Sequence, residues 1–284
     1  MRLVDPPPLA FRTAHAGDSG DRRGAIRAVL QTLRAERGPA TDAAQLTHLR
    51  ALGGVIHDLG LRQRVEWRTQ RPGIQDAERA FVGVDSRAYP TDVSDAQQVD
   101  EAFAAVVKDF GRLDVVVNNA GISRVGPHTQ DVTDEDWHDS IAVMQTGVFF
   151  CMRAAGRIMI PQQSGSVINI SSIRGFSPNP GRMSYCAPKA AVIMMTQVAA
   201  GEWAPHKVRV NAIAPGVLKT PMWDTDVARG AIDEPAILEV VPMHRLGLPS
   251  EVGKLAAFLA SDDAAYITGS VLTIDGALTS IPAA

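Results

Sequence analysis

Cysteine is scarce in this sequence, whose 284 residues include only Cys151 and Cys186. Two cysteines are too few for the disulfide framework that stabilises a small secreted domain. The first residues, MRLVDPPPLAF, also lack the apolar segment of a signal peptide. These absences predict a protein of a reducing compartment, the cytoplasm.

Long apolar runs and a strong charge of one sign are missing as well. The most apolar tract, residues 141–152, is flanked by charged residues and is shorter than the roughly 20 residues of a membrane span. The formal net charge of −3 is far from the basic excess of a nucleic-acid binder. His128, His138 and His206 have no metal-ligand spacing. We therefore expect no membrane, no nucleic acid and no metal as partners.

Lysine is absent from the first third of the chain. Residues 1–87 contain 14 arginines and no lysine, whereas residues 88–284 contain 9 arginines and 5 lysines. The first third also lacks clear apolar strand runs, although the whole chain is long enough for one large domain. We therefore divide the chain into an atypical N-terminal part, residues 1–87, and a core, residues 88–284, that carries the cofactor and substrate site.

From residue 88 onward, apolar runs of strand length alternate with segments of helical periodicity. Strands are predicted at residues 113–121, 166–172, 208–216 and 270–276, and helices at 99–111, 134–160, 185–204 and 249–261. Thr133 is the expected N-cap of the second helix, and Pro161 is its expected end. The alternation predicts an α/β fold, a single domain with a Rossmann-like, doubly wound parallel sheet. Ligands of such a sheet bind at the carboxyl ends of its strands, which here read NNAG, ISS and APG.

Tyr185 and Lys189 have the spacing of neighbours on one face of a helix. A lysine ammonium beside a phenol favours the phenolate and so lowers the pKa of the phenol from about 10. A tyrosine tuned in this way exchanges a proton near neutral pH, as the reduction of a carbonyl or the oxidation of an alcohol requires. Ser172 ends the preceding predicted strand, where its hydroxyl would hold the substrate oxygen beside Tyr185.

The pair resembles the short-chain dehydrogenase/reductase family when it is taken with five further segments: DVSD (92–95), NNAG (118–121), INISS (168–172), RVNAIAPG (209–216) and YITG (266–269). The family's spacing of Ser, Tyr and Lys falls on Ser172, Tyr185 and Lys189, and the resemblance extends from about Thr91 to Gly276. It implies an oxidoreductase that interconverts a secondary alcohol and a ketone, with NAD or NADP as cofactor. It also implies a small-molecule substrate and a homodimer or homotetramer formed through the long helices.

The resemblance assigns the contacts to the cofactor. Besides Tyr185 and Lys189, the residues implied to bind it are Gly17, Gly20, Gly24, Asp92, Val93, Asn118, Ala120, Gly121, Pro215, Gly216, Leu218 and Thr220. Asp92 and Val93 would lie against the adenine, and Lys189 would also bind the nicotinamide ribose.

Two residues near the catalytic positions depart from the family pattern. The family has an Asn that helps to hold a water near the lysine, and this chain has Met144 at that position. A thioether does not replace an amide in a hydrogen-bonded proton relay. Pro188 lies between Tyr185 and Lys189, so their alignment requires a helix that begins near Ser184 or Tyr185.

The glycine loop departs further from the pattern. Gly17, Gly20 and Gly24 have offsets of 0, 3 and 7, where the family's phosphate loop has a different register. The one candidate for a second strand with a terminal acid, VIHD (55–58), comes late. Two explanations stay open: a divergent loop whose arginines contact the phosphates, or a frame-shifted or misjoined N-terminal segment.

Two functions from different classes follow. The first is an NAD(P)-dependent oxidoreductase with Tyr185 as acid and base, Lys189 as its tuner and Ser172 as the anchor of the substrate oxygen. The second is a catalytically weak or inactive subunit of the same fold that acts in binding or oligomerisation, which Met144, Pro188 and the altered loop favour. A hydrolase is disfavoured because the sequence has no G-x-S-x-G nucleophile motif.

Overall fold

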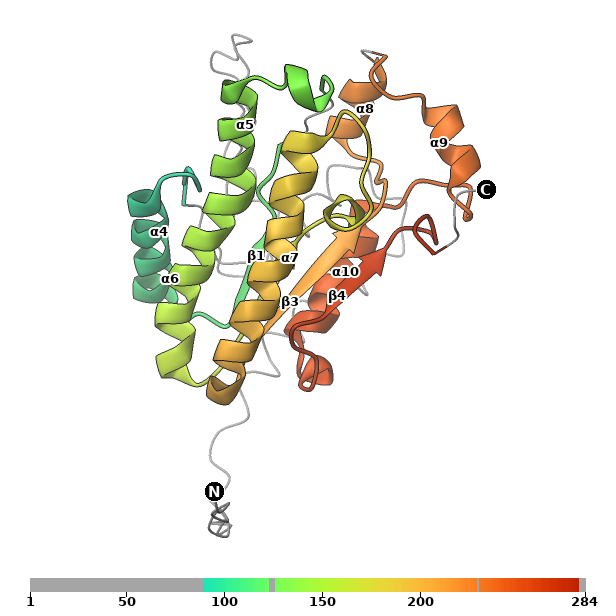
Figure 1. The fold of residues 1–284 in the computed structure, drawn as a ribbon. Coiled ribbons are helices and arrows are strands. Elements are labelled where there is room, and N and C mark those ends of the chain that lie inside the picture. Colours follow the sequence, from blue (N-terminus) through green and yellow to red (C-terminus); the bar gives the residue numbers. More distant parts are fainter. Residues whose placement is uncertain (1–88, 123–125, 229, 281–284) are drawn as a thin grey trace, which may run out of the picture. The chain divides into compact units, whose positions relative to one another are not determined.

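A computed structural model describes residues 89–122, 126–228 and 230–280 (Figure 1). The expectations for residues 1–87, including those for Gly17, Gly20 and Gly24, lie outside the described residues. The strands are β1 (Val115–Asn118), β2 (Gly165–Ile170), β3 (Val208–Pro215) and β4 (Val271–Ile274). The α-helices are α4 (Ala96–Phe110), α5 (Asp134–Ile141), α6 (Gly147–Gln162), α7 (Met183–Trp203), α8 (Pro221–Ala228), α9 (Glu234–Val240) and α10 (Pro249–Ala260). Five short segments complete the set: a π-turn, η2 (Ala142–Thr146), and the 3-10 turns η1 (Thr129–Asp131), η3 (Ile173–Gly175), η4 (Ala204–His206) and η5 (Asp262–Ala264).

The four strands form one parallel sheet in the order β1–β2–β3–β4. Neighbouring residues of a strand point to opposite faces, and both faces are covered here. Val116 and Val167 pack with α4, α6 and α7, whereas Val117 and Ile168 pack with α10 on the other side. The structure therefore confirms the predicted α/β fold, a parallel sheet with helices on its two faces.

Helix α4 begins at Ala96, before the predicted Val99, because Asp95 caps it. The Asp95 carboxylate accepts hydrogen bonds from the backbone N–H groups of Gln97 (2.9 Å) and Gln98 (3.2 Å), which the first helical turn leaves unpaired. The helix ends before Gly111, as predicted, and the φ of 78° at this glycine lies in the left-handed region.

The predicted helix at 134–160 differs from the observed one in two ways. It consists of α5, the π-turn η2 and α6, and it continues through Pro161 to Gln162. The prediction that Pro161 ends the helix was therefore wrong. A proline in the last turn removes a single backbone hydrogen bond. The end of the helix is in turn held to the start of the sheet, because the Gln162 side chain both accepts from Leu113 N–H (3.0 Å) and donates to Leu113 C=O (2.7 Å).

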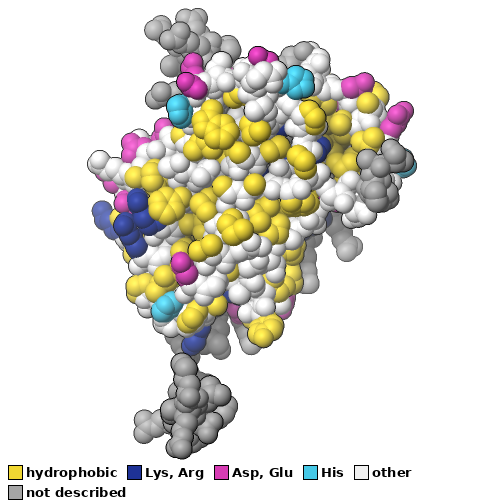
Figure 2. Space-filling view, in the orientation of Figure 1, with side chains coloured by type: hydrophobic (Ala, Val, Ile, Leu, Met, Phe, Trp, Pro, Cys, Tyr) yellow, Lys and Arg dark blue, Asp and Glu magenta, His cyan; other side chains and the backbone are white. Residues whose placement is uncertain are grey.

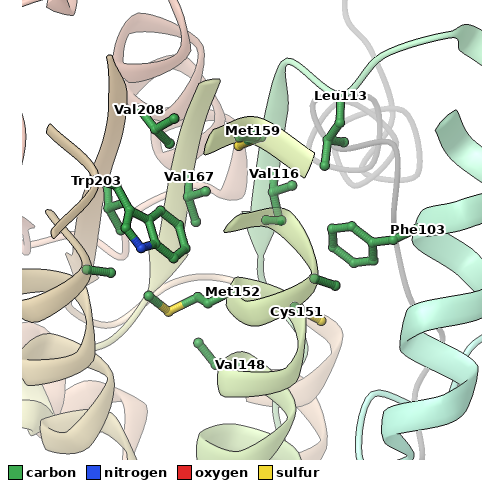
Figure 3. Close-up of a cluster of buried hydrophobic side chains, with 14 of the residues drawn as sticks. Phe103, Leu113, Val116, Val148, Cys151, Met152, Met159, Val167, Trp203 and Val208 are labelled. Atoms are coloured by element: carbon green, nitrogen blue, oxygen red, sulfur yellow. The ribbon is translucent and has the colours of Figure 1, made fainter. Parts of the chain in front are cut away.

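A hydrophobic cluster fills the space between the sheet and the helices α4, α6 and α7 (Figure 3). Phe103 of α4 faces Val116 of β1, and Trp203 at the end of α7 lies near Val167 and Val208. A β-carbon added at Gly156 of α6 would lie 2.8 Å from a ring carbon of Trp203, so only glycine allows these helices to approach so closely. In the described part of the chain, no helix is both long enough and apolar enough to cross a membrane.

Candidate functional site

The residues that the sequence analysis singled out meet at one edge of the sheet. Asn118 is the last residue of β1, Ser172 follows β2 by two residues, and Gly216 directly follows β3. Because the strands are parallel, their carboxyl ends share an edge, and helix α7 starts beside it with Tyr185 and Lys189 in its first two turns. This edge is the expected ligand site of a doubly wound sheet.

Ser172 and Tyr185 are joined by a side-chain hydrogen bond. The Ser172 side chain is buried at 6% exposure, and its hydroxyl also accepts the backbone N–H of Arg174 at 3.1 Å, which fixes it at the start of η3. Tyr185 is partly buried, with its backbone N–H bonded to the carbonyl of Arg182. A hydroxyl fixed next to a phenol in this way gives two hydrogen-bonding groups that converge on one substrate oxygen.

The pKa of Tyr185 differs from the sequence-based expectation. Burial raises the pKa of this phenol above its usual value, while the hydrogen bond from Ser172 and the nearby charges of Arg182 and Arg174 lower it. The expectation of a lowered pKa was therefore wrong, because burial outweighs the influences that favour the phenolate. The Lys189 ammonium lies 5.8 Å from the centre of the Tyr185 ring and is engaged by a backbone carbonyl.

Lys189 is a buried lysine, at 5% exposure, directed to the end of β2. Its Nζ donates a hydrogen bond to the carbonyl of Ile170 at 2.8 Å, and its own backbone carbonyl accepts from Ser171 Oγ at 2.8 Å. Burial disfavours the charged form and lowers the pKa of Lys189 to about 8. An ammonium has three donors, so further acceptors can bind it besides the Ile170 carbonyl.

Helix α7 continues unbroken through Pro188. It begins at Met183, slightly before the predicted Ser184 or Tyr185, and runs for 21 residues. Pro188 is buried inside it, so the helix lacks the hydrogen bond that a residue 188 N–H would give to the Ser184 carbonyl. Contacts with β3, η3 and the core hold the segment helical, and Tyr185 and Lys189 stay one turn apart.

Met144 lies where the family's Asn would be, in the π-turn η2, and is fully buried. π-turns inside helices are frequent at functional sites. A β-carbon added at Gly121 would lie 3.9 Å from Lys189 Nζ and 4.0 Å from Met144 Sδ. The thioether and the ammonium therefore share one neighbourhood, and Gly121 leaves room beside both.

A chain of buried amides and hydroxyls links three elements of the site. Asn118 Nδ2 donates to Asn169 Oδ1 at 2.7 Å, and Asn169 Nδ2 donates to Thr196 Oγ1 at 2.8 Å. The chain ends when Thr196 donates to the Val192 carbonyl within α7. The sequence analysis did not single out Asn169, although a polar residue in the middle of an otherwise apolar strand was a signal for such a network.

The other predicted cofactor residues fall into two groups. On the side of α4, Asp92 accepts from Ser94 Oγ at 2.6 Å, and Val93 packs so closely that a β-carbon at Gly147 would lie 2.9 Å from it. Ala120 follows β1 and is partly exposed, as is Gly121.

On the side of β3, the backbone after Pro215 is tightly placed. A β-carbon at Gly216 would lie 2.7 Å from the Asp275 side chain, so the turn requires glycine. Leu218 pairs with Gly247 in an isolated bridge, and Thr220 caps α8 by accepting the backbone N–H of Trp223 at 3.1 Å. Within the described residues, no group of three or more His, Cys, Asp or Glu has the geometry to hold a metal ion.

Comparisons with known proteins find close relatives of this arrangement. A family model described as Enoyl-(Acyl carrier protein) reductase matches residues 67–279. The chain is 43% identical over 190 residues to the 3-oxoacyl-(acyl-carrier-protein) reductase FabG of Thermotoga maritima, which spans 67% of this chain and 76% of that protein. It is 41% identical over 214 residues to the galactitol 2-dehydrogenase of Rhizobium johnstonii, spanning 72% and 81% of the two chains. The solved structure of ElxO with NADP bound superposes with a TM-score of 0.69 at 38% identity, over 73% of this chain and 84% of that one.

Proposed function

This chain belongs to the short-chain dehydrogenase/reductase family, and from that membership we propose that it interconverts a secondary alcohol and a ketone with NAD or NADP. One observation carries the proposal: Ser172, Tyr185 and the buried Lys189 converge at the carboxyl edge of the sheet. The relatives at about 40% identity include a reductase and a dehydrogenase, which supports both directions of the reaction.

The roles of the three side chains follow from their positions. The nicotinamide, when bound, supplies or accepts the hydride at the reacting carbon. In the reductive direction Tyr185 donates its phenolic proton to the carbonyl oxygen, while Ser172 donates a hydrogen bond to the same oxygen. The positive charge of Lys189 favours the phenolate that Tyr185 becomes after the transfer. In the oxidative direction the phenolate takes the proton from the alcohol.

The residues at this edge fit a nicotinamide nucleotide. Gly121 leaves space next to Lys189 Nζ, and this ammonium has donors beyond the one that binds Ile170, which suits ribose hydroxyls. The Asn118 side chain is hydrogen-bonded to Asn169, which fixes the end of β1 as one side of the cofactor site. Titration with NADH and NADPH, followed by nicotinamide fluorescence, tests this fit. We expect micromolar binding of at least one; folded protein that binds neither would contradict the proposal.

The lowered pKa of Lys189 predicts the pH dependence of the reduction. The lysine is protonated below about pH 8 and loses its proton above it. We therefore expect kcat/KM for the reduced cofactor to fall above about pH 8, approaching a tenfold loss per pH unit. A pH profile of initial rates at low cofactor concentration measures this.

Unfolding would not explain such a loss, because the effect of this lysine on stability has the opposite sign. Between the folded pKa of about 8 and the usual lysine pKa of 10.5, the unfolded chain binds more protons than the folded one, so this group's contribution to stability rises with pH there. Thermal unfolding measured over the same pH range separates the two effects. A rate that stays level up to pH 10 would show that the charge of Lys189 does not support the reaction.

An inactive subunit is the second candidate, and the buried Met144 beside Lys189 favours it. The two candidates differ in one result. A weak enzyme binds the cofactor and turns over a ketone slowly, whereas an inactive subunit gives no turnover with any ketone even when the cofactor is bound.

We further propose that α6 and α7 form the interface of a homodimer or homotetramer. Figure 2 shows hydrophobic side chains gathered over these helices. Phe149 on α6 is 47% exposed, and Met194 and Val198 on α7 are 60% and 52% exposed. Helix α7 carries only two charged residues, and a helix that is apolar on all sides is normally covered. Arg153 lies over the Phe149 ring, and its buried Nε has no hydrogen-bond partner among the described residues.

A charge placed in this surface is expected to separate the subunits. Val198→Glu would bury an unpaired carboxylate at a cost of about 3 kcal/mol, on the order of a hundredfold in affinity. Sedimentation at micromolar concentration measures the change, with Ala104→Glu on the exposed side of α4 as control. Equal masses for the wild type and the Val198→Glu variant would place the interface elsewhere.

A further inference from the structure

Two arginines flank the pair of residues that would bind the substrate oxygen. Arg174 is two residues beyond Ser172, and its backbone N–H donates to Ser172 Oγ at 3.1 Å. Arg182 is three residues before Tyr185, and its carbonyl accepts the backbone N–H of Tyr185 at 3.0 Å. Each guanidinium is therefore carried by backbone that is hydrogen-bonded directly to the catalytic residue beside it.

Both guanidinium groups act electrostatically on the same hydroxyl. The charges of Arg182 and Arg174 each lower the pKa of the Tyr185 phenol, and the two arginines repel each other. Burial lowers the pKa of Arg182 more than any other influence on it. The charge of Arg182 is thus partly out of water, and the charges of both arginines act on the phenol.

Among the described residues, one carboxylate offsets part of the charge of the two arginines. Asp226 of α8, which is 5% exposed, attracts Arg182. Among the described residues Arg174, Arg182 and Asp226 together carry a charge of +1. Within the part of the chain that the structure describes, the Arg174 guanidinium donates one hydrogen bond, from Nη1 to the Ser177 carbonyl at 3.3 Å, which leaves most of its five donors for other acceptors. Two like charges held half-buried are unfavourable unless an anion joins them.

We infer that Arg182, supported by Arg174, binds an anionic group of the substrate, so that the preferred substrate is a ketone with a carboxylate or phosphate near its carbonyl. The inference rests on the proposed function, because it places the anion next to the oxygen that Ser172 and Tyr185 hold. A guanidinium binds such groups through two parallel hydrogen bonds. Arg182 directly precedes α7 and lies three residues before Tyr185, which suits an anion a few bonds from the carbonyl carbon.

Pairs of related ketones, one anionic and one neutral, test the inference. The carboxylate pairs are 3-oxobutanoate with its amide and 4-oxopentanoate with its amide; dihydroxyacetone phosphate with dihydroxyacetone tests the phosphate. With the preferred reduced cofactor, we expect kcat/KM to favour the anionic member of at least one pair by tenfold or more. In Arg182→Gln this preference is lost and the ratio of the two kcat/KM values approaches one, whereas any change in the pKa of Tyr185 acts on both members of a pair alike. Arg182→Lys keeps the charge but not the paired donors, and is expected to retain part of the preference.

Arg157→Gln is the matched control. Arg157 lies on α6, its side chain is 63% exposed, and it forms an ion pair with Asp100, so the same charge is removed far from the substrate oxygen. We expect its ratio of anionic to neutral substrate to equal that of the wild type. If Arg182 only tied α7 to Asp226, Arg182→Gln would weaken both members of a pair equally, and this result would overturn the inference.

Binding measurements keep the inference testable without turnover. Calorimetric titration of the wild type and Arg182→Gln with the two keto acids and the phosphate, in the presence of the oxidised cofactor, measures anion binding directly. Binding to the wild type that weakens at least tenfold in the variant supports the inference. No binding to the wild type, or equal binding to both proteins, overturns it. Reduction of the neutral ketones alone would uphold the proposed function while refuting an anionic substrate.

Discussion

Replacing Tyr185 by phenylalanine is expected to lower kcat for ketone reduction by about 10²–10⁴-fold. The substitution keeps the ring that packs beside Lys189 and removes only the hydroxyl that is bonded to Ser172. Without this hydroxyl, the substrate oxygen loses the proton donor that the proposed mechanism assigns to it. Cofactor affinity is expected to stay near that of the wild type, because Lys189 and the carboxyl ends of the strands are unchanged.

Tyr266→Phe is the matched control, since Tyr266 is fully exposed. It removes the same atom from the same residue type and is expected to leave kcat unchanged. Single-turnover rates with bound reduced cofactor separate the proton-transfer step from product release. A Tyr185→Phe variant that reduces ketones at the wild-type rate would mean that the proton comes from another group, and the assignment of Tyr185 would be wrong.

Met144→Asn is expected to raise kcat by about tenfold. A thioether accepts hydrogen bonds poorly, whereas an amide oxygen accepts a charge-assisted bond worth about 1.5–3 kcal/mol. Met144 Sδ and Lys189 Nζ lie about equally close to Gly121, so an amide at this position would reach the neighbourhood of the ammonium. The resemblance to the family gives the same expectation, because an Asn there helps to hold a water near the lysine.

The pH profile distinguishes this effect from a structural one. An amide oxygen near the ammonium favours the charged form, so the loss of activity that begins near pH 8 should move to higher pH in Met144→Asn. Met144→Leu keeps the apolar volume, and we expect it to raise neither kcat nor the pH at which activity is lost. Thermal unfolding is measured for both, because a buried amide without partners costs about 1–3 kcal/mol. An Asn variant that folds, with kcat and pH profile unchanged, would show that this position does not limit the reaction.

The sequence predicted the elements whose signals are local. Strand-length apolar runs ending in glycine or polar residues located all four described strands, because both faces of a parallel sheet are buried. Thr133 caps α5 as expected, with its hydroxyl accepting the Asp136 N–H at 3.1 Å. The spacing of Tyr185 and Lys189 placed them one turn apart on a helix, which the structure has.

Features that depend on contacts between residues distant in the sequence could not be predicted from local patterns. Two hydrogen bonds between Gln162 and Leu113 hold the end of α6 beyond Pro161. Because these residues are far apart in the sequence, no local pattern predicts the contact. Spacing brought Lys189 next to Tyr185 but did not reveal that the Ile170 carbonyl binds the ammonium or that burial dominates the pKa of the phenol. The altered glycine loop lies outside the described residues, so both explanations for it stay predictions.

The buried chain from Asn118 through Asn169 to Thr196 determines which parts of the site can move. It ties β1, β2 and α7 together by hydrogen bonds out of water, where breaking one leaves unpaired polar groups. The segments α8 and α9 are joined by a part-buried hydrogen bond from Trp223 Nε1 to Glu234 and by ion pairs of the half-exposed Lys219 with Asp224 and Glu234. Such surface ion pairs contribute little to stability. The catalytic edge is therefore held in place by buried hydrogen bonds, so that its groups need little rearrangement to meet a substrate.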